Sequence, residues 1–272
     1  MTQQNAAQLA STWDGVVAGY DEATSATADA IARQALGIMG VTPGQKVLDV
    51  AAGPGAFSIL AAEAGADVLA VDFSRGMVEY LRDKARRLGV EGLRAEVMDG
   101  QDLELGDDSF DVAFSALGIM LFPDRAAGMR EFCRVLKTGG LGAIVAFTGP
   151  EGQGLDRLMM GAMKKAIPGY ERAGPDRRFS LANPDAFRAE MLAAGFSRVN
   201  MFTVRAVRPF DSPETLWPRL ADVIPRWRTM INDLTDSQRQ VFGDAFVEQV
   251  RSEQGDGPFG VEQEARIAVG VK

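Results

Sequence analysis

The stretch VLDVAAGPGAF, residues 47–57, carries the pattern from which the fold follows. Its first half is typical of a short buried strand containing Asp49, and Gly53 and Gly55 fall in the turn before the next apolar segment. Glycine adopts positive φ angles at little cost and lets a ligand come close to the backbone. Since a single Gly-x-Gly occurs in many tight turns, its meaning depends on the rest of the chain.

The chain around this stretch alternates short apolar runs with helical periodicity. The runs suited to strands are residues 46–51, 67–71, 94–98, 111–115, 141–147, 196–207 and 266–271. Amphipathic segments separate them; after Ser74, for example, apolar side chains recur on one helical face. This alternation predicts βαβ units and therefore an α/β fold.

Two long segments do not follow the alternation, and we expect both to be helical lids over the carboxyl edge of the sheet. The second contains a capping box, Thr235-x-x-Gln238. The predicted division, in chain order, is N-terminal cap helices with a cofactor-binding core (1–150), a helical lid insertion (151–182), a core helix and strand (183–210), a second helical insertion (211–259) and a final core strand (260–272).

The composition excludes several classes of function. The formal net charge is −8, and a surface of that sign repels a phosphate backbone, which argues against nucleic acid as the substrate. Histidine is absent and Cys133 is the single cysteine, so no metal site is expected. We find neither a secretory leader nor an apolar run of membrane-spanning length, and we expect a cytoplasmic protein.

Three aspartates come at the ends of successive predicted strands. Asp49 ends the first, Asp72 lies 19 residues after Gly53, and Asp99 ends the third. The carboxyl ends of parallel strands meet at one sheet edge, where open α/β sheets bind ligands, and an acid at the position of Asp72 accepts hydrogen bonds from ribose hydroxyls. Aspartates that cap helices explain any one of these positions, but explain all three poorly.

On these motifs the sequence resembles the class I S-adenosylmethionine (SAM)-dependent methyltransferases, in particular the branch of the ubiquinone/menaquinone C-methyltransferases. VLDVAAGPG is similar to their first motif, AVDFSRGMV to the second, MDGQDL to the adenine-recognition segment, and FDVAFSALGIMLFPD to the fourth-strand motif. The resemblance covers about residues 13–147. It implies a Rossmann-like, seven-stranded, mostly parallel sheet with helices on both faces.

The resemblance also implies which residues hold SAM. Asp72 would bind the ribose, Met77 would pack on the adenine and Asp99 would meet the adenine amine, while Tyr20 would lie beside the bound SAM. The full set of expected cofactor-binding residues is Tyr20, Asp49, Ala51, Gly53, Gly55, Asp72, Phe73, Met77, Asp99, Gly100, Ser115 and Ala116.

Two alternatives remain open. An NAD-dependent oxidoreductase requires a third glycine three residues after Gly55, where this chain has Ser58, and a pyrophosphate would face the acid Asp49. A protein that binds SAM without catalysis fits the same motifs, because a fold does not secure a function. We favour a methyltransferase, which would move a methyl group to a C, O or N atom of a small metabolite.

The acceptor is expected to be largely apolar, because adaptable apolar groups follow the fourth strand and fill the lids. The residues expected to contact it are Gly118, Met120, Leu121, Met160, Met163 and Trp217. No histidine is available as a base, so Tyr20 is the best-placed candidate, although a role in covering the cofactor is favoured. The pair Arg177–Arg178 suits an anionic group, but a solvated face explains it better. A homodimer is the default assembly.

Overall fold

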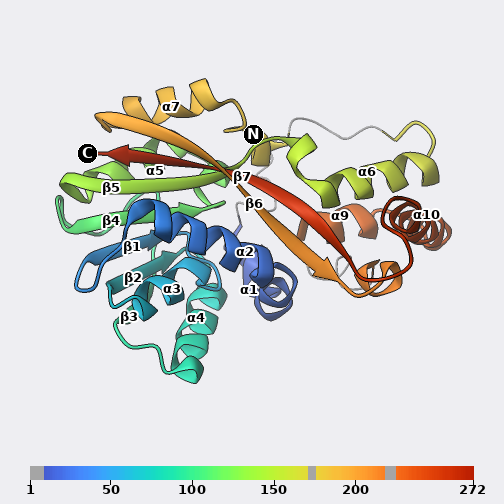
Figure 1. Cartoon of the computed structure of the whole chain (residues 1–272), viewed down its shortest axis with the longest axis horizontal. Helices are drawn as coiled ribbons and strands as arrows, with labels where there is room; N and C mark the ends of the chain where they lie inside the picture. The colour runs from blue at the N-terminus through green and yellow to red at the C-terminus, as the bar shows by residue number, and fades with distance from the viewer. Residues whose placement is uncertain (1–8, 171–175, 218–224) are drawn as a thin grey trace.

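The computed structural model describes residues 9–170, 176–217 and 225–272, and it places a seven-stranded sheet at the centre (Figure 1). The strands are β1 (Lys46–Val50), β2 (Asp67–Asp72), β3 (Leu93–Val97), β4 (Phe110–Ala116), β5 (Leu136–Phe147), β6 (Arg198–Phe210) and β7 (Phe259–Val271). Their order is β3-β2-β1-β4-β5-β7-β6. β1 to β5 are parallel to one another, and β7 is antiparallel to both β5 and β6. The predicted fold class is confirmed.

Helices cover both faces of the sheet because successive strand residues point to opposite sides. Leu48 and Val50 of β1 face a core cluster that includes residues of α5 (Arg125–Arg134) and α7 (Pro184–Ala193). Val47 faces the other cluster, with α2 (Val17–Met39) and α3 (Ala56–Glu63). The helix α4 (Arg75–Leu88) packs next to α3 on that same face, and the short α1 (Ala10–Asp14) precedes α2. No helix in the described ranges has the length and apolar character needed to cross a bilayer.

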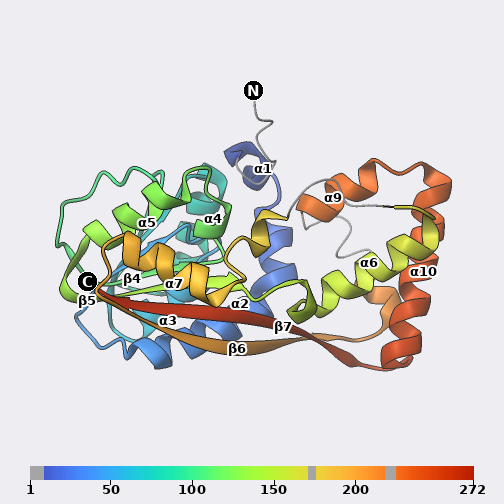
Figure 2. The same ribbon diagram turned by 90° about the horizontal axis from the view of Figure 1, so that it is seen from above.

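The remaining helices form one cap at the outer end of a long hairpin (Figure 2). β6 and β7 pair along their whole length, from Arg198 opposite Val271 to Phe210 opposite Phe259, whereas β5 pairs only with the inner half of β7. On the outer half lie α6 (Gly154–Ala166), α9 (Pro225–Asn232) and α10 (Asp236–Gln254). They share a core with the end of β7, so we call α6, α9 and α10 the helical cap.

Both hairpin strands are longer than the apolar runs at 196–207 and 266–271 predicted. The outer half alternates, with Phe259 and Val261 buried and polar residues between them. A strand that is covered on one face has this alternation, and a search for continuous apolar runs misses it. The two segments that sequence analysis treated as separate insertions therefore meet in space, because α6 belongs to the first and α9 and α10 to the second. Residues 171–175 and 218–224 of those segments lie outside the described residues.

The capping box that starts α10 is confirmed and gives a stability prediction. The Thr235 side chain accepts a hydrogen bond from the amide of Gln238, whose side-chain oxygen accepts one from the amide of Thr235 at 3.0 Å. Thr235→Ala is expected to lower the free energy of unfolding by about 1 kcal/mol, measured by urea titration. Ser237→Ala, on the exposed first turn, is the matched control; an equal loss there would contradict the role of the box.

Candidate cofactor and acceptor site

The loop after β1 contains two glycines that are needed for different reasons. Gly55 precedes α3 at φ +84°, and a Cβ there would lie 2.1 Å from the Leu81 side chain, so close helix packing requires this glycine. Gly53, at φ +55°, would place a Cβ in open space. Because Gly53 also lines the cavity described below, that space is available for a ligand against the backbone. Ala51 shares the left-handed conformation at φ +57°.

Asp72, at the end of β2, fixes this loop. One carboxylate oxygen accepts a hydrogen bond from the Gly53 amide at 2.9 Å, and the other accepts one from the Ser74 amide, also at 2.9 Å. Burial raises the pKa of Asp72 to about 6, although both amide hydrogen bonds act to lower it. The carboxylate therefore joins the two loops at the carboxyl edge while it faces the cavity.

Asp49, in β1, points to the α3 face and is 2% exposed. The Ser58 hydroxyl donates to its carboxylate at 2.5 Å. Burial raises the pKa of Asp49 to about 7 in spite of that hydrogen bond. Ser58 stands where a dinucleotide-binding motif has its third glycine, and here its side chain orients the acid instead.

Asp99 and Gly100 follow β3 at the same edge. The backbone amide and side-chain nitrogen of Gln101 both donate to Asp99, at 2.9 and 3.0 Å. A Cβ on Gly100 would lie 2.7 Å from both Phe122 and Val50, so only glycine fits where these side chains close on the backbone. Both Asp99 and Gly100 line the cavity.

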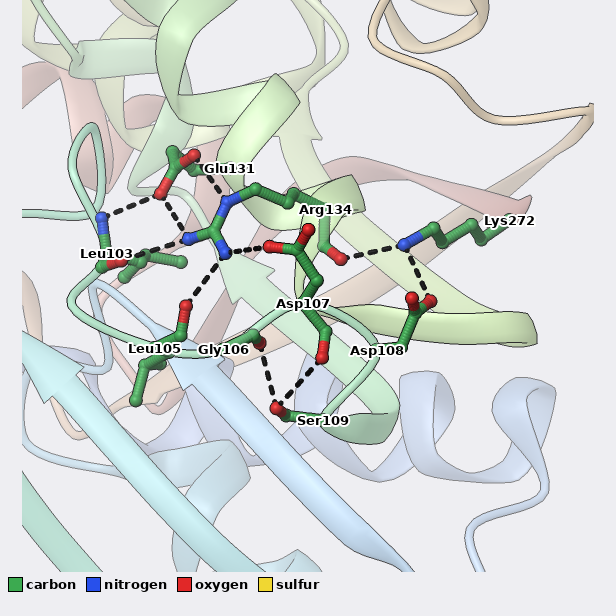
Figure 3. Close-up of polar contacts among 9 residues, drawn as sticks. All are labelled: Leu103, Leu105, Gly106, Asp107, Asp108, Ser109, Glu131, Arg134 and Lys272. Atoms are coloured by element: carbon green, nitrogen blue, oxygen red, sulfur yellow. Dashed lines mark hydrogen bonds and ion pairs between the residues drawn. The ribbon is translucent and has the colours of Figure 1, made fainter.

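Arg134 of α5 holds the connection between β3 and β4 through several hydrogen bonds (Figure 3). Its guanidinium donates to the carbonyls of Leu103 and Leu105 at 2.9 and 2.7 Å, and to the carboxylates of Asp107 and Glu131. Lys272 donates to the Arg134 carbonyl at 2.7 Å. These carboxylates raise the pKa of Arg134, so the guanidinium stays charged. The network therefore holds the connection that follows Asp99 against α5.

The N-terminal helices close over this edge. Asp14 accepts hydrogen bonds from the Ser74 hydroxyl and the Gly76 amide at 2.6 and 2.9 Å, at the start of α4. Asp21 of α2 is buried and pairs with Lys84 at 2.7 Å. These contacts place Tyr20 in the cavity wall, where burial raises the pKa of its phenol.

A cavity of about 680 Å³ extends from these strand ends, under α2, to the helical cap. The expected cofactor residues that line it are Tyr20, Asp49, Ala51, Gly53, Asp72, Phe73, Met77, Asp99, Gly100 and Ala116. Gly55 and Ser115 do not line the cavity. Ser115 is fully buried, and its hydroxyl has no hydrogen-bond partner in the described part of the chain. The volume, the acids and the open space at Gly53 suit a nucleoside with an amino-acid arm.

The expected acceptor residues divide into two groups. Gly118, Met120 and Leu121 line the cavity. Met160, Met163 and Trp217 do not. Met163 is fully buried in the core of the helical cap, and Trp217 packs edge-on against Phe242 with ring centres 4.9 Å apart. The inward faces of the cap helices meet one another, which the sequence pattern of a single helix does not reveal.

The pair Arg177–Arg178 lies at the cavity, but Arg178 is neutralised. Its guanidinium donates to Asp156 at 2.8 Å and to Asp176 at 2.5 Å, and it stacks 4.8 Å from the centre of the Phe179 ring. Two carboxylates therefore balance its charge, so Arg178 is neither on the solvated face that sequence analysis favoured nor an unpaired cation for an anionic group. Arg177 is exposed at the cavity wall.

Sequence analysis missed Arg208, which lies in the cavity wall on β6. Val204, Ala206 and Arg208 alternate on the buried face of that strand, so a cation stands in an apolar position of the pattern. A charged residue at an apolar position of the strand pattern was the sequence signal that could have identified Arg208. Thr27 of α2 also lines the cavity and was not predicted.

The fold and the site define a nucleotide-binding α/β protein, and comparisons with known proteins give its family. Residues 47–140 match a family described as a methyltransferase domain. A demethylmenaquinone methyltransferase of Mycobacterium sp. (strain JLS) is 30% identical over 190 residues, which are 68% of this chain and 76% of that protein. The chain belongs to the class I SAM-dependent methyltransferases, and SAM is the cofactor of that family.

Two further comparisons set the limits of this relationship. An uncharacterised protein of Mycobacterium tuberculosis (strain ATCC 25618 / H37Rv) is 37% identical over 109 residues, but the match spans only 39% of that protein's length. The structure of Haemonchus contortus phosphoethanolamine N-methyltransferase 2, in complex with SAM, is similar to this chain. The alignment covers 95% of this chain and 57% of that chain. Its TM-score is 0.56 at 16% identity, which shows the fold alone.

Proposed function

We propose that this protein transfers a methyl group from SAM to a small, largely apolar acceptor. The observation that carries the proposal is one continuous cavity with two kinds of wall. Asp72, Asp99 and the Gly53 loop supply nucleoside-binding groups at one end. Leu155 and Trp227 supply apolar surface at the other, under the helical cap. Both substrates of a methyl transfer would therefore meet in one cavity.

The chain's residues have definite tasks in this proposal. Asp72 would accept hydrogen bonds from the ribose hydroxyls, Asp99 would accept one from the adenine amine, and Met77 would pack on the adenine ring. SAM, when bound, supplies the methyl group on a sulfonium that is already a good leaving group. The protein then has to align the acceptor in line with the transferred carbon and exclude water, which is a contribution of proximity and orientation.

Tyr20 is better suited to covering the site than to removing a proton. Burial raises the pKa of its phenol above the ordinary value near 10, so the phenol is protonated at neutral pH and donates hydrogen bonds. Its ring stacks edge-on against Trp13 with ring centres 5.4 Å apart, which holds it in the cavity wall. An acceptor that arrives already ionised would need no base.

A binding and turnover experiment tests the proposal. The purified protein is titrated with SAM, S-adenosylhomocysteine (SAH) and NAD by calorimetry, and SAH release is then measured with candidate acceptors. The first two acceptors to test are demethylmenaquinone and phosphoethanolamine, which appear in the names of a relative and of a structural neighbour. We expect SAM and SAH to bind with micromolar affinity, NAD to give no heat, and the apolar acceptor to be methylated.

The alternatives predict different results in the same experiment. Binding of SAM without SAH release for any acceptor, apolar or anionic, would support a non-catalytic SAM-binding protein. A clear heat with NAD and none with SAM would support an oxidoreductase and would contradict the proposal.

A further inference from the structure

Arg208 is a buried cation whose partners do not balance its charge. It is 9% exposed, and its Nη2 donates one hydrogen bond to the hydroxyl of Thr27 at 3.1 Å. Its Nη1 is buried and has no hydrogen-bond partner among the residues that the structure describes. Within the same ranges no carboxylate pairs with it. The side chain nevertheless lines the cavity.

A guanidinium in such a place is unusual because burial of a charge is unfavourable unless the charge is paired. Burial lowers the pKa of Arg208, but arginine starts from so high a value that it remains charged. Arg178, in the wall of the same cavity, shows the ordinary arrangement, since it is paired with Asp156 and Asp176. Compared with Arg178, the Arg208 guanidinium lacks an anionic partner among the described residues.

The surroundings of Arg208 place the missing partner on the acceptor side. It lies opposite Val261 in the pairing of β6 with β7, and Val261 lines the cavity beside the helical cap. The expected nucleoside-binding residues after β1, β2 and β3, in contrast, lie within the matched residues 47–140. Thr27 and Tyr20 are seven residues apart and therefore share one face of α2, and the charges of both Arg208 and Asp72 act on Tyr20. The guanidinium is thus close to the place where cofactor and acceptor would meet.

We propose that Arg208 binds an anionic oxygen of the methyl acceptor through Nη1, with the Tyr20 hydroxyl as a second donor nearby. The proposal rests on the proposed function and narrows its substrate class to apolar acceptors that carry one carboxylate, phenolate or enolate oxygen. An oxygen that is methylated as an anion has no proton to lose, which suits a chain that contains no histidine. A guanidinium with a free N–H edge is a suitable donor for such an oxygen.

Two probes of one shape test the anion preference. Calorimetry measures the affinity of 2-naphthoate and of its uncharged amide, 2-naphthamide, with and without saturating SAH. Wild-type protein is expected to bind the carboxylate at least about tenfold more tightly than the amide, the difference that one charge-assisted contact supplies. A second comparison tests a phenolate: the affinity for 2-naphthol is measured at pH values above and below the pKa of its hydroxyl.

Variants of one strand assign the preference to Arg208. Arg208→Met keeps the length of the side chain and is expected to remove the tenfold difference, whereas Arg208→Lys keeps part of it. Arg205→Met is the matched control, because Arg205 lies on the same strand, points outward and pairs with Glu264. SAH affinity is expected to stay within about twofold of wild type in all three, which also shows that they fold.

Three results would overturn the proposal: a carboxylate preference that persists in Arg208→Met, wild-type protein that binds neither probe, or a loss of SAH affinity in Arg208→Met. The last would assign the guanidinium to the carboxylate of the cofactor. Failure of wild-type protein to bind SAM or SAH would contradict the proposed function, and the titrations without SAH would still decide the anion site separately.

Discussion

Asp72→Ala is expected to weaken the binding of SAM and SAH by at least about 100-fold, the loss that follows when two hydrogen bonds to a charged group disappear. The carboxylate has two tasks, because it faces the cavity and also accepts hydrogen bonds from the Gly53 and Ser74 amides. Alanine removes both the ligand contacts and the brace that shapes the loop. Calorimetry with SAH measures the effect directly.

Two further variants separate these tasks. Asp72→Asn keeps one accepting oxygen and is expected to retain intermediate affinity. Asp67→Ala changes an acid at the opposite end of the same strand, where it makes an exposed ion pair with Arg94, and should bind SAH normally. Wild-type affinity in Asp72→Ala would mean that the ribose is held elsewhere.

Asp49→Asn is expected to change how stability depends on pH. The pKa of Asp49 is about 7 in the folded chain, against a model value of 3.8. Between those values the folded state holds a proton that the unfolded state has released, so wild-type stability falls as pH rises from about 4 to about 7. The shift corresponds to an upper limit of about 4 kcal/mol. Asparagine does not titrate, so above pH 7 the variant should be the more stable protein without ligand.

Denaturant titration at a series of pH values, without SAM, measures this difference. Asp72, with a pKa near 6, also makes stability fall as pH rises, but only up to about pH 6. Asp49→Asn leaves this contribution of Asp72 in place. Asp111→Asn is a control with the opposite sign, because hydrogen bonds from Lys137 and the Lys46 amide lower the pKa of Asp111. That variant should be less stable than wild type above about pH 4. Parallel curves for wild type and Asp49→Asn would show that Asp49 is already ionised.

The same acid should link SAM binding to pH. SAM carries a sulfonium and an ammonium, so it favours the ionised form of Asp49. Wild-type affinity for SAM is therefore expected to rise as pH increases toward about 8, and Asp49→Asn should lose this part of the dependence.

The core could be predicted from the sequence because local patterns determine it. Continuous apolar runs mark strands that are buried on both faces, and the aspartates at 49, 72 and 99 share an edge once the strands are parallel. Ten of the expected cofactor residues line one cavity for this reason. Their contacts with SAM stay predictions.

The acceptor end could not be predicted in the same way, because it depends on which helices meet. The sequence does not tell whether Met163 and Trp217 face a ligand or another helix. Met163 is buried where α6 packs on α10, and Trp217 packs on Phe242 of α10. Arg208 lies in the cavity wall only because β6 extends past the parallel sheet and lies beside α2. Such contacts join residues far apart in the chain.

The long hairpin of β6 and β7 has a mechanical consequence. A two-stranded ladder joins the core to the helical cap, so the cap is not suspended on flexible linkers and its distance from the sheet is set by paired backbone. Two-stranded ribbons twist more strongly than wider sheets. Because Arg208 lies on this ribbon, a substitution that changes the twist of the ribbon is expected to move Arg208 and the helical cap together.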